Sequence, residues 1–257
     1  MSRKPKVAEL AAGIDGTARL PDAALFDLDD TILATSEGAN SAWVAVTDRF
    51  APVLVAMGHR IAPEMLRLAI HEYRVWFWSD AERNRVGRLN PCEALRQNVR
   101  GGLEKLGVAA DPDLTEEMAA AWTAVRWDAC RPIEGAIETL QVLRARGVKL
   151  GLITNGSADV QRKKVEHLGL PDLMDHIQIE GAFGVGKPEP RAYAHALDTL
   201  GTGPDRAWMV GDNLEFDVLA PMRMGIRGIW VDGEGEGLPG DTTMRPNRIV
   251  RAISELV

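Results

Sequence analysis

The sequence predicts an α/β protein: an open, doubly wound parallel sheet into which an all-helical domain is inserted. Two observations predict the sheet. Short, nearly continuous apolar runs are typical of strands buried on both faces, and helical patterns lie between these runs. A third observation predicts the insertion, because one long block of the chain has helical periodicity without clear strands. Strands that alternate with helices favour a parallel sheet, since each parallel pair needs a crossover connection.

The predicted strands are brief apolar runs that end abruptly in polar residues. They are residues 23–26, 148–153, 207–210 and 226–231. Helices are predicted between and after them. Pro132 suits the first turn of a helix and Gly147 can end it, with Ile133, Ile137 and Leu140 at helical spacing. Further helices are predicted over residues 158–168, 191–200 and 247–256.

Residues 36–131 break this alternation and are predicted to form a separate helical domain. Five of the seven tryptophans lie in this block, and we interpret them as residues that pack helices together rather than stack on a ligand. The predicted organisation is therefore an N-terminal arm over residues 1–20, an α/β core over residues 21–35 and 132–257, and a helical domain over residues 36–131.

Composition narrows the function classes. The chain has 257 residues, of which 46% are hydrophobic and 26% charged, as in ordinary globular proteins. Its formal net charge of −7 argues against a nucleic-acid partner, because no basic excess can displace counterions from a phosphate backbone. No apolar stretch approaches the roughly 20 residues that cross a bilayer, so no membrane partner is expected. Cys92 and Cys130 have no metal-ligand spacing; a reduced, buried pair in a cytoplasmic protein is expected, with a disulfide as the alternative.

Four polar segments, each at the end of an apolar run, contain the candidate functional residues. They are residues 27–31, 154–157, 186–190 and 211–217. Ligands of doubly wound sheets bind beyond the carboxyl ends of the strands, so folding is expected to bring these segments together.

The acids of the first and fourth segments suit a divalent cation. Asp27 and Asp29 are two residues apart and project to one side of an extended backbone, whereas Asp30 is expected to bond or cap locally. Neighbouring carboxylates repel each other unless a cation lies between them. Asp212 and Asp217 add two acids, and oxygen ligands suit Mg²⁺. A turn or a helix cap is the alternative for the first segment taken alone.

The second and third segments suit a phosphate. The Thr154 hydroxyl can donate to phosphate oxygens, although a helix N-cap is the alternative and Ser157 can take that position. Lys187 lies on a constrained backbone beside Pro188, which suits a fixed positive charge; the alternative is a solvated loop lysine. Residues 181–187 also match the start of a nucleotide-binding P-loop, but Pro188 stands where a magnesium-binding hydroxyl is required, so we reject an ATPase or kinase.

Together these segments resemble the motifs of the haloacid dehalogenase-like hydrolases, and among them the phosphatases with a helical C1-type cap. Residues 27–31 resemble the first motif, Thr154 in Leu-Ile-Thr-Asn-Gly the second, Lys187 in Gly-Lys-Pro-Glu-Pro the third, and Gly211-Asp212 with Asp217 the fourth. The resemblance covers residues 22–231. It implies a Rossmann-like core and identifies residues 36–131 as the cap.

The resemblance also implies a function, namely Mg²⁺-dependent hydrolysis of a small phosphorylated metabolite. Asp27 would be the nucleophile that forms an aspartyl-phosphate, and Asp29 the acid and base. Four residues are implied to hold Mg²⁺: Asp27, Asp29 through its backbone carbonyl, Asp212 and Asp217. Three are implied to bind the phosphoryl group: Thr154, Asn155 and Lys187.

Alternatives within the same fold stay open. A phosphomutase shares the core, and a non-catalytic binding member is a less favoured hypothesis. A dehalogenase needs no proton donor at the position of Asp29, so the acid there favours a phosphatase. In the cap, Arg83, Arg85 and Arg88 either bind an anionic part of the substrate or form a solvated basic turn. A monomer and a homodimer are both compatible with the sequence.

Overall fold

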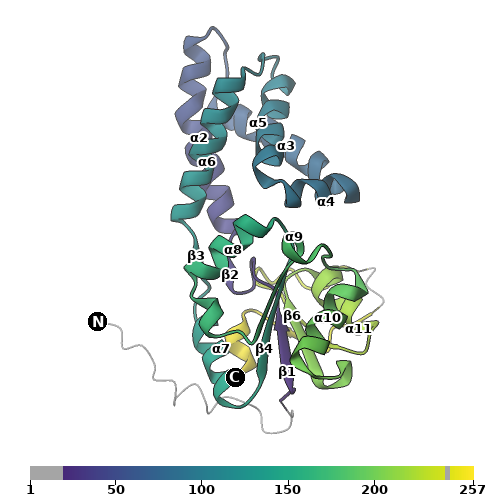
Figure 1. Ribbon diagram of the computed structural model, residues 1–257. Helices are drawn as coiled ribbons and strands as arrows, with labels where there is room; N and C mark the ends of the chain where they lie inside the picture. The colour runs from purple at the N-terminus through teal and green to yellow at the C-terminus, as the bar shows by residue number, and fades with distance from the viewer. Residues whose placement is uncertain (1–19, 241–243) are drawn as a thin grey trace, which may run out of the picture. The chain divides into compact units, whose positions relative to one another are not determined.

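The computed structural model describes residues 20–240 and 244–257 (Figure 1). The predicted N-terminal arm lies, apart from Leu20, outside the described residues. The chain divides into two compact units, one formed by the segments up to Ala34 and from Arg131 to Val257, the other by Thr35–Cys130. These limits differ by one residue from the predicted boundaries. Each unit is described by itself.

The first unit is built on a six-stranded sheet whose strand pairs are all parallel. In spatial order the strands are β5 (His176–Ile179), β4 (Lys149–Thr154), β1 (Ala23–Phe26), β6 (Ala207–Gly211), β7 (Arg227–Val231) and β8 (Arg248–Val250). The central strand β1 is completely buried, which explains why it reads as a continuous apolar run. The predicted α/β class with a parallel sheet is confirmed.

Helices cover both faces of this sheet. On one side lies α7 (Ala136–Ala145), and on the other lie α10 (Pro190–Leu200) and the short α11 (Ala220–Met222) (Figure 1). Tyr193 and Leu197 of α10 pack against Leu25 and Met209 of the sheet. The remaining helices of this unit are α8 (Ala158–His167), α9 (Glu180–Phe183), a π-helix over Leu214–Leu219 and 3-10 turns at Leu170–Asp172, Pro204–Arg206 and Ile253–Leu256.

The helical pattern of residues 247–256 led to a wrong prediction at the C-terminal end. The helix predicted over residues 247–256 is wrong, because this segment forms β8 followed by a 3-10 turn. The reason is tertiary pairing with β7. The Asn247 backbone N–H donates to the Gly228 carbonyl at 2.9 Å, and the Gly228 N–H donates to Asn247 Oδ1 at 2.9 Å. These two bonds dock the segment onto an edge that helical periodicity does not reveal.

Two other elements differ from expectation. The helix predicted to begin at Pro132 begins at Ala136, because Arg131–Pro132 (β3) pairs antiparallel with Leu33–Ala34 (β2). The edge strand β5 was not predicted, since His176 and Gln178 interrupt its apolar character. A strand with polar residues at alternate positions resembles a loop when only four residues long.

The second unit is all-helical, and its residues are all described. Its helices are α2 (Ser36–Ala56), α3 (Pro63–Ser79), α4 (Ala81–Leu89), α5 (Pro91–Lys105) and α6 (Pro112–Asp128). Their apolar faces form one core, in which Trp43 and Trp122 lie 5.4 Å apart between ring centroids. Trp76 and Trp127 are exposed, so the packing interpretation does not extend to every tryptophan.

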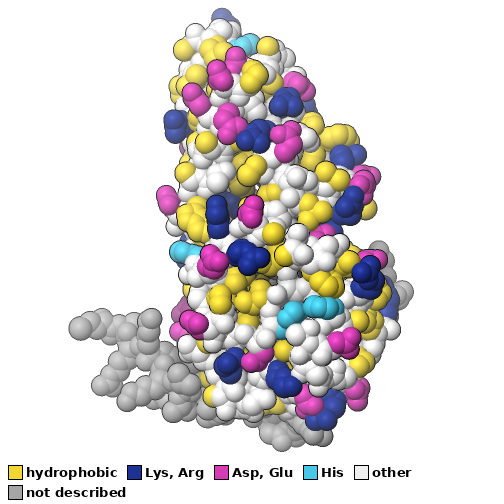
Figure 2. Space-filling view, viewed as in Figure 1, with side chains coloured by type: hydrophobic (Ala, Val, Ile, Leu, Met, Phe, Trp, Pro, Cys, Tyr) yellow, Lys and Arg dark blue, Asp and Glu magenta, His cyan; other side chains and the backbone are white. Residues whose placement is uncertain are grey.

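The surface carries charges of both signs. Figure 2 shows Lys and Arg side chains interspersed with Asp and Glu on the visible face. Within residues 20–240 and 244–257, no helix combines the length and apolarity needed to cross a membrane. Neither cysteine forms a disulfide, and Cys92 is exposed, which corrects the expectation of two buried thiols.

Candidate active site

The site lies at the carboxyl edge of the sheet, where β1 stands between β4 and β6. Phe26 pairs with Leu152 on one side and Val210 on the other, so the residues that follow these strands meet at one edge. The chain crosses from β1 to β4 in one direction and later reaches β6 in the other. This reversal makes the edge a topological switch point, the place where doubly wound sheets bind ligands.

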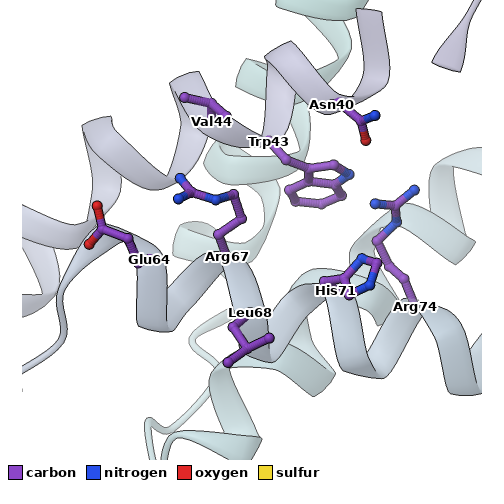
Figure 3. Close-up of a pocket in the computed structure, with 8 residues that line it drawn as sticks. All are labelled: Asn40, Trp43, Val44, Glu64, Arg67, Leu68, His71 and Arg74. Atoms are coloured by element: carbon purple, nitrogen blue, oxygen red, sulfur yellow. The ribbon is translucent and has the colours of Figure 1, made fainter. Parts of the chain in front are cut away.

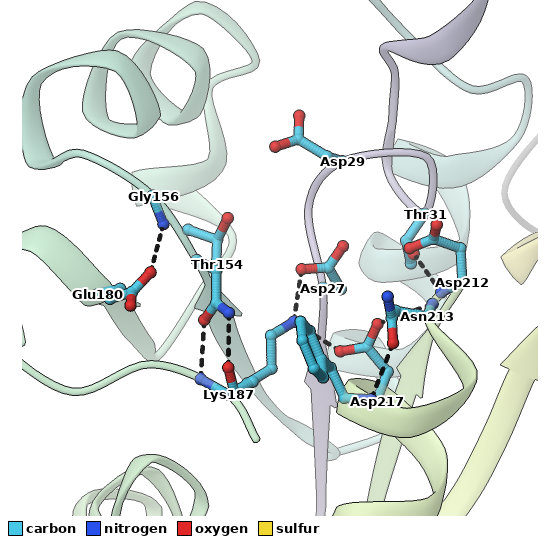
Figure 4. A network of polar contacts seen from close by, with 12 residues as sticks. Asp27, Asp29, Thr31, Thr154, Gly156, Glu180, Lys187, Asp212, Asn213 and Asp217 are labelled. Carbon is cyan, nitrogen blue, oxygen red and sulfur yellow. Dashed lines mark hydrogen bonds and ion pairs between the residues drawn. The ribbon is translucent and has the colours of Figure 1, made fainter. Parts of the chain in front are cut away.

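A buried lysine joins two of the predicted acids. Lys187 Nζ lies 2.6 Å from Asp27 Oδ1 and 2.6 Å from Asp217 Oδ1, and only 2% of its side chain is exposed (Figure 4). A solvated loop lysine, the alternative considered above, is therefore wrong. A buried ammonium is stable only when it is paired and hydrogen-bonded, as it is between these two carboxylates.

The loop that presents Lys187 is held by Asn155. The Asn155 side-chain amide donates to the Lys187 carbonyl at 2.7 Å and accepts from the Lys187 N–H at 2.8 Å. Asn155 was predicted to bind phosphate, but both ends of its amide are engaged with this loop. Gly186 is required here, because a Cβ at this position would lie 2.5 Å from Glu180 Cδ and 2.7 Å from Asn155 Oδ1.

Glu180 is a buried residue of the candidate site that the sequence did not reveal. It is buried, and its carboxylate accepts a hydrogen bond from the Gly156 N–H at 2.9 Å (Figure 4). The Gly181 N–H donates to the Gly156 carbonyl at 2.9 Å. These two bonds tie the turn after β4 to α9. A single acid at the start of a short helix carries no signal of such a role.

Three carboxylates form the candidate metal site. Asp27, Asp212 and Asp217 each offer one oxygen, and these oxygens lie within 4.8 Å of one another. Burial raises the pKa of Asp27 to about 7, with Lys187 acting to lower it and Asp217 and Asp29 acting to raise it. Burial, followed by the charges of Asp27 and Asp217, raises the pKa of Asp212 to about 8.

The pKa values of Asp217 and Lys187 are also shifted by burial and by neighbouring charges. Burial raises the pKa of Asp217, against the opposing pull of Lys187. Burial acts to lower the pKa of Lys187, but the charges of Asp217 and Asp27 outweigh it, so that this pKa is raised. One ammonium therefore does not neutralise the three acids. A divalent cation would, and an all-oxygen donor set suits Mg²⁺.

Neighbouring groups hold Asp212 and Asp217 in place. The Asp212 N–H donates to Thr31 Oγ1 at 3.1 Å, and Trp230 Nε1 donates to the Asp212 carbonyl at 2.8 Å. Asp217 Oδ2 accepts from the Asn213 N–H at 3.1 Å. Trp230 was predicted only as part of a strand. Its indole N–H points at the site because Gly211 of β6 pairs with Trp230 of β7.

Asp29 has different surroundings from the other acids. The backbone turns at Asp30, which has a φ of 55° and whose N–H donates to the Leu33 carbonyl at 2.7 Å. Asp30 is thus a turn residue. The Asp29 side chain is bound by Gln161 and Lys164 of α8. It is not one of the three carboxylates that form the metal cluster.

The cap arginines make local contacts. They lie on the helix α4, which corrects the predicted turn. Arg83 donates to the carbonyls of Trp76 and Phe77, and Arg85 forms a bidentate ion pair with Glu82. Arg88 donates to Asn84 Oδ1. These contacts favour the structural interpretation over substrate binding.

The helical unit contains a cavity of its own. It has a volume of about 340 Å³ and lies between α2 and α3 (Figure 3). Its lining combines the Trp43 ring with charged and polar side chains, namely Asn40, Glu64, Arg67, His71 and Arg74, and with Val44 and Leu68. Burial, with a smaller effect of Arg126, lowers the pKa of Arg74.

Comparison with known proteins identifies the family. The family model for haloacid dehalogenase-like hydrolases matches residues 21–225. The chain therefore belongs to the haloacid dehalogenase-like hydrolases, and the resemblance seen in its four motifs is confirmed.

Several curated relatives are phosphatases. The chain is 37% identical to the phosphoserine phosphatase of Thermus thermophilus, over 61% of each chain. It is 30% identical to the glyceraldehyde 3-phosphate phosphatase of Methanopyrus kandleri, over 60% of this chain and 70% of the relative. The N-acylneuraminate-9-phosphatase of Rattus norvegicus is 26% identical over 91% of each chain. The match thus spans less than two thirds of the length of the Thermus phosphatase.

Solved structures share the fold. The putative hydrolase YfnB from Bacillus subtilis, bound to magnesium, has a TM-score of 0.70 and 18% identity, covering 93% of this chain and 97% of that one. The 2-haloacid dehalogenase from Pseudomonas syringae has a TM-score of 0.60 and 25% identity, covering 92% and 96%. The fold is thus shared with one protein named as a hydrolase and one named as a dehalogenase.

Proposed function

We propose that this protein is a phosphatase that hydrolyses the phosphomonoester of a small metabolite. The observation that carries the proposal is the buried Asp27–Lys187–Asp217 ion pair beside Asp212, at the ligand-binding edge of the sheet. The three relatives described above are phosphatases, which supports it. The cytoplasmic location expected from the sequence belongs to the same proposal.

The donor set fits Mg²⁺. Three carboxylates face one another across less than 5 Å, and burial, which disfavours the charged form, raises the pKa of each. Repulsion from neighbouring acids adds to this effect at Asp27 and Asp212. Asp27, Asp212 and the backbone carbonyl of Asp29 would hold the ion, with Asp217 supporting it. When bound, Mg²⁺ supplies the positive charge that lets a phosphate dianion approach these acids.

In the first half-reaction, a carboxylate oxygen of Asp27 attacks phosphorus. The bond from phosphorus to the ester oxygen breaks, and that oxygen leaves with a proton from Asp29. Lys187 favours the ionised form of Asp27 and orients its carboxylate through their 2.6 Å contact. In the second half-reaction, Asp29 takes a proton from water, which attacks the acyl-phosphate; inorganic phosphate is released and Asp27 is regenerated.

Phosphoryl transfer depends mainly on positioning and charge neutralisation, which this compact set provides. Asp29 favours a phosphatase over a dehalogenase, because cleavage of a carbon–halogen bond needs no proton on an oxygen. A phosphomutase remains the alternative; it would move phosphate within the substrate instead of releasing it.

The test is phosphate release from p-nitrophenyl phosphate, with Mg²⁺, with EDTA, and in the Asp27→Asn variant. Activity should require Mg²⁺ and should be lost in Asp27→Asn. The matched control is Asp159→Asn, which removes an exposed carboxylate near the second motif and should leave activity unchanged. Activity that survives EDTA or Asp27→Asn would contradict the proposed site.

A further inference from the structure

The helix α8 buries two polar side chains that the four motifs do not include. Gln161 is 3% exposed and Lys164 is 4% exposed. They are three residues apart and therefore lie on the same face of the helix. In contrast, their neighbour Lys163 is exposed. Burial of a lysine and an amide on one face requires partners, and both partners are residues of the candidate site.

Lys164 binds Asp29 through both carboxylate oxygens. Its Nζ lies 2.7 Å from Oδ1 and 2.8 Å from Oδ2. The Asp29 side chain is one-third exposed, so one side of it stays accessible to a substrate. Lys164 and Asp29 thus form an ion pair that fixes where the carboxyl group lies. It also restricts the rotation of the Asp29 side chain.

Gln161 connects Asp29 to Thr154. Its Nε2 lies 3.0 Å from Asp29 Oδ2 and 2.5 Å from Thr154 Oγ1. An ionised carboxylate only accepts hydrogen bonds, so the NH₂ end of Gln161 must face Asp29. The second N–H of the same group then donates to Thr154. The Thr154 oxygen is therefore an acceptor in this bond, and its own O–H is directed to a different acceptor.

We propose that Gln161 and Lys164 are positioning residues that hold Asp29 and orient the Thr154 hydroxyl as a donor to the phosphoryl group. This inference rests on the proposed phosphatase function. One helix face thereby links the group that exchanges protons with the group that binds phosphate. Both hydrogen bonds of Gln161 lie within the first unit. Gln161 is more than 130 positions from Asp29 in the sequence and seven positions from Thr154.

The experiment uses the full-length chain and two double-mutant cycles, Lys164→Met with Asp29→Asn and Gln161→Met with Thr154→Val. Turnover is measured on an aryl phosphate, p-nitrophenyl phosphate, and on an alkyl phosphate, glycerol 3-phosphate. The aryl leaving group departs without a proton, whereas the alkoxide needs one. Lys163→Met is the matched control. Circular dichroism and the unfolding temperature show whether each variant is folded.

Lys164→Met and Gln161→Met should each lower turnover by about 10- to 100-fold, as is typical when a residue that orients a functional group is removed. Lys164→Met should slow the alkyl substrate more than the aryl one and should have little further effect in the Asp29→Asn background. Gln161→Met should weaken the binding of inorganic phosphate, measured by calorimetry, by roughly two- to tenfold, and should have little effect once Thr154→Val is present.

Additive effects in the double variants, or equal losses on both substrates with phosphate binding unchanged, would overturn this inference alone. So would folded single variants with wild-type turnover. A wild-type protein that releases phosphate from neither substrate overturns the proposed function and this inference with it.

Discussion

Asp212 should make the metal-free protein less stable as the pH rises, and Mg²⁺ should remove this dependence. The pKa of Asp212 is raised from 3.8 to about 8, chiefly by burial. A carboxyl whose pKa is raised in the folded state binds its proton more tightly there than in the unfolded chain. Its contribution to stability is fully present below pH 3.8 and is lost as the pH rises through about 8.

The size of the effect follows from the shift. Each pKa unit corresponds to about 1.4 kcal/mol, and because Asp212 is partly exposed, solvent screening reduces the cost of its ionised form to roughly 1–3 kcal/mol near pH 8. In a chain of this size 1 kcal/mol changes the unfolding temperature by about 2–4 °C, which predicts a change of about 2–12 °C. Asp212→Asn removes the titration. In EDTA this variant should be more stable than the wild type at pH 8 and close to it at pH 4.

The assay is thermal unfolding from pH 4 to pH 9, in EDTA and in Mg²⁺, for the wild type, Asp212→Asn and the control Asp159→Asn. Mg²⁺ should stabilise the wild type more at pH 8 than at pH 5, because protons compete for the same oxygens. It should stabilise Asp212→Asn much less. A pH-independent effect of Mg²⁺, or wild type and Asp212→Asn curves that run parallel in EDTA, would refute this account of the site.

Three further predictions test individual contacts. Gly186→Ala should destabilise the protein by about 1–3 kcal/mol and lower turnover more than tenfold, because its Cβ would overlap Glu180 and Asn155; denaturant unfolding and initial rates measure this. Trp230→Phe removes the N–H bonded to the Asp212 carbonyl and should weaken Mg²⁺ binding by about two- to tenfold in a calorimetric titration, with the fold intact. Arg85→Ala should leave turnover unchanged on a panel of phosphorylated metabolites, since Arg85 pairs with exposed Glu82; a selective loss on one of them would restore the substrate-binding interpretation.

Buried strands were the most predictable part of the fold. A parallel strand covered on both faces is apolar over most of its length. The strands β1, β4, β6 and β7 are therefore recognisable in the sequence. The edge strands β5 and β8 are not, because polar residues interrupt their short apolar pattern: His176 and Gln178 in β5, and Arg248 in β8. For β8 the deciding interaction is the pairing of Asn247 with Gly228, which lies 19 residues away and leaves no local pattern.

In the candidate site, too, some residues could be recognised from the sequence and others only from the structure. Residues that must be acids or a lysine for chemical reasons stand directly after strands, so Asp27, Asp212 and Lys187 are recognisable by type and position. Residues that orient them are not recognisable in this way. Trp230 and Glu180 belong to a strand and a short helix, and only their burial against the site gives them a role.

By itself, the sequence determined the α/β class, the helical insertion and the four polar segments, because periodicity and strand-end chemistry are local properties of the chain. The tertiary structure alone decided how these segments share charge. Lys187 forms ion pairs with both Asp27 and Asp217, and α8 turns Gln161 and Lys164 toward Asp29. Hydrogen bonds and ion pairs act over about 3 Å, so they depend on how distant segments pack, which spacing along the chain does not specify.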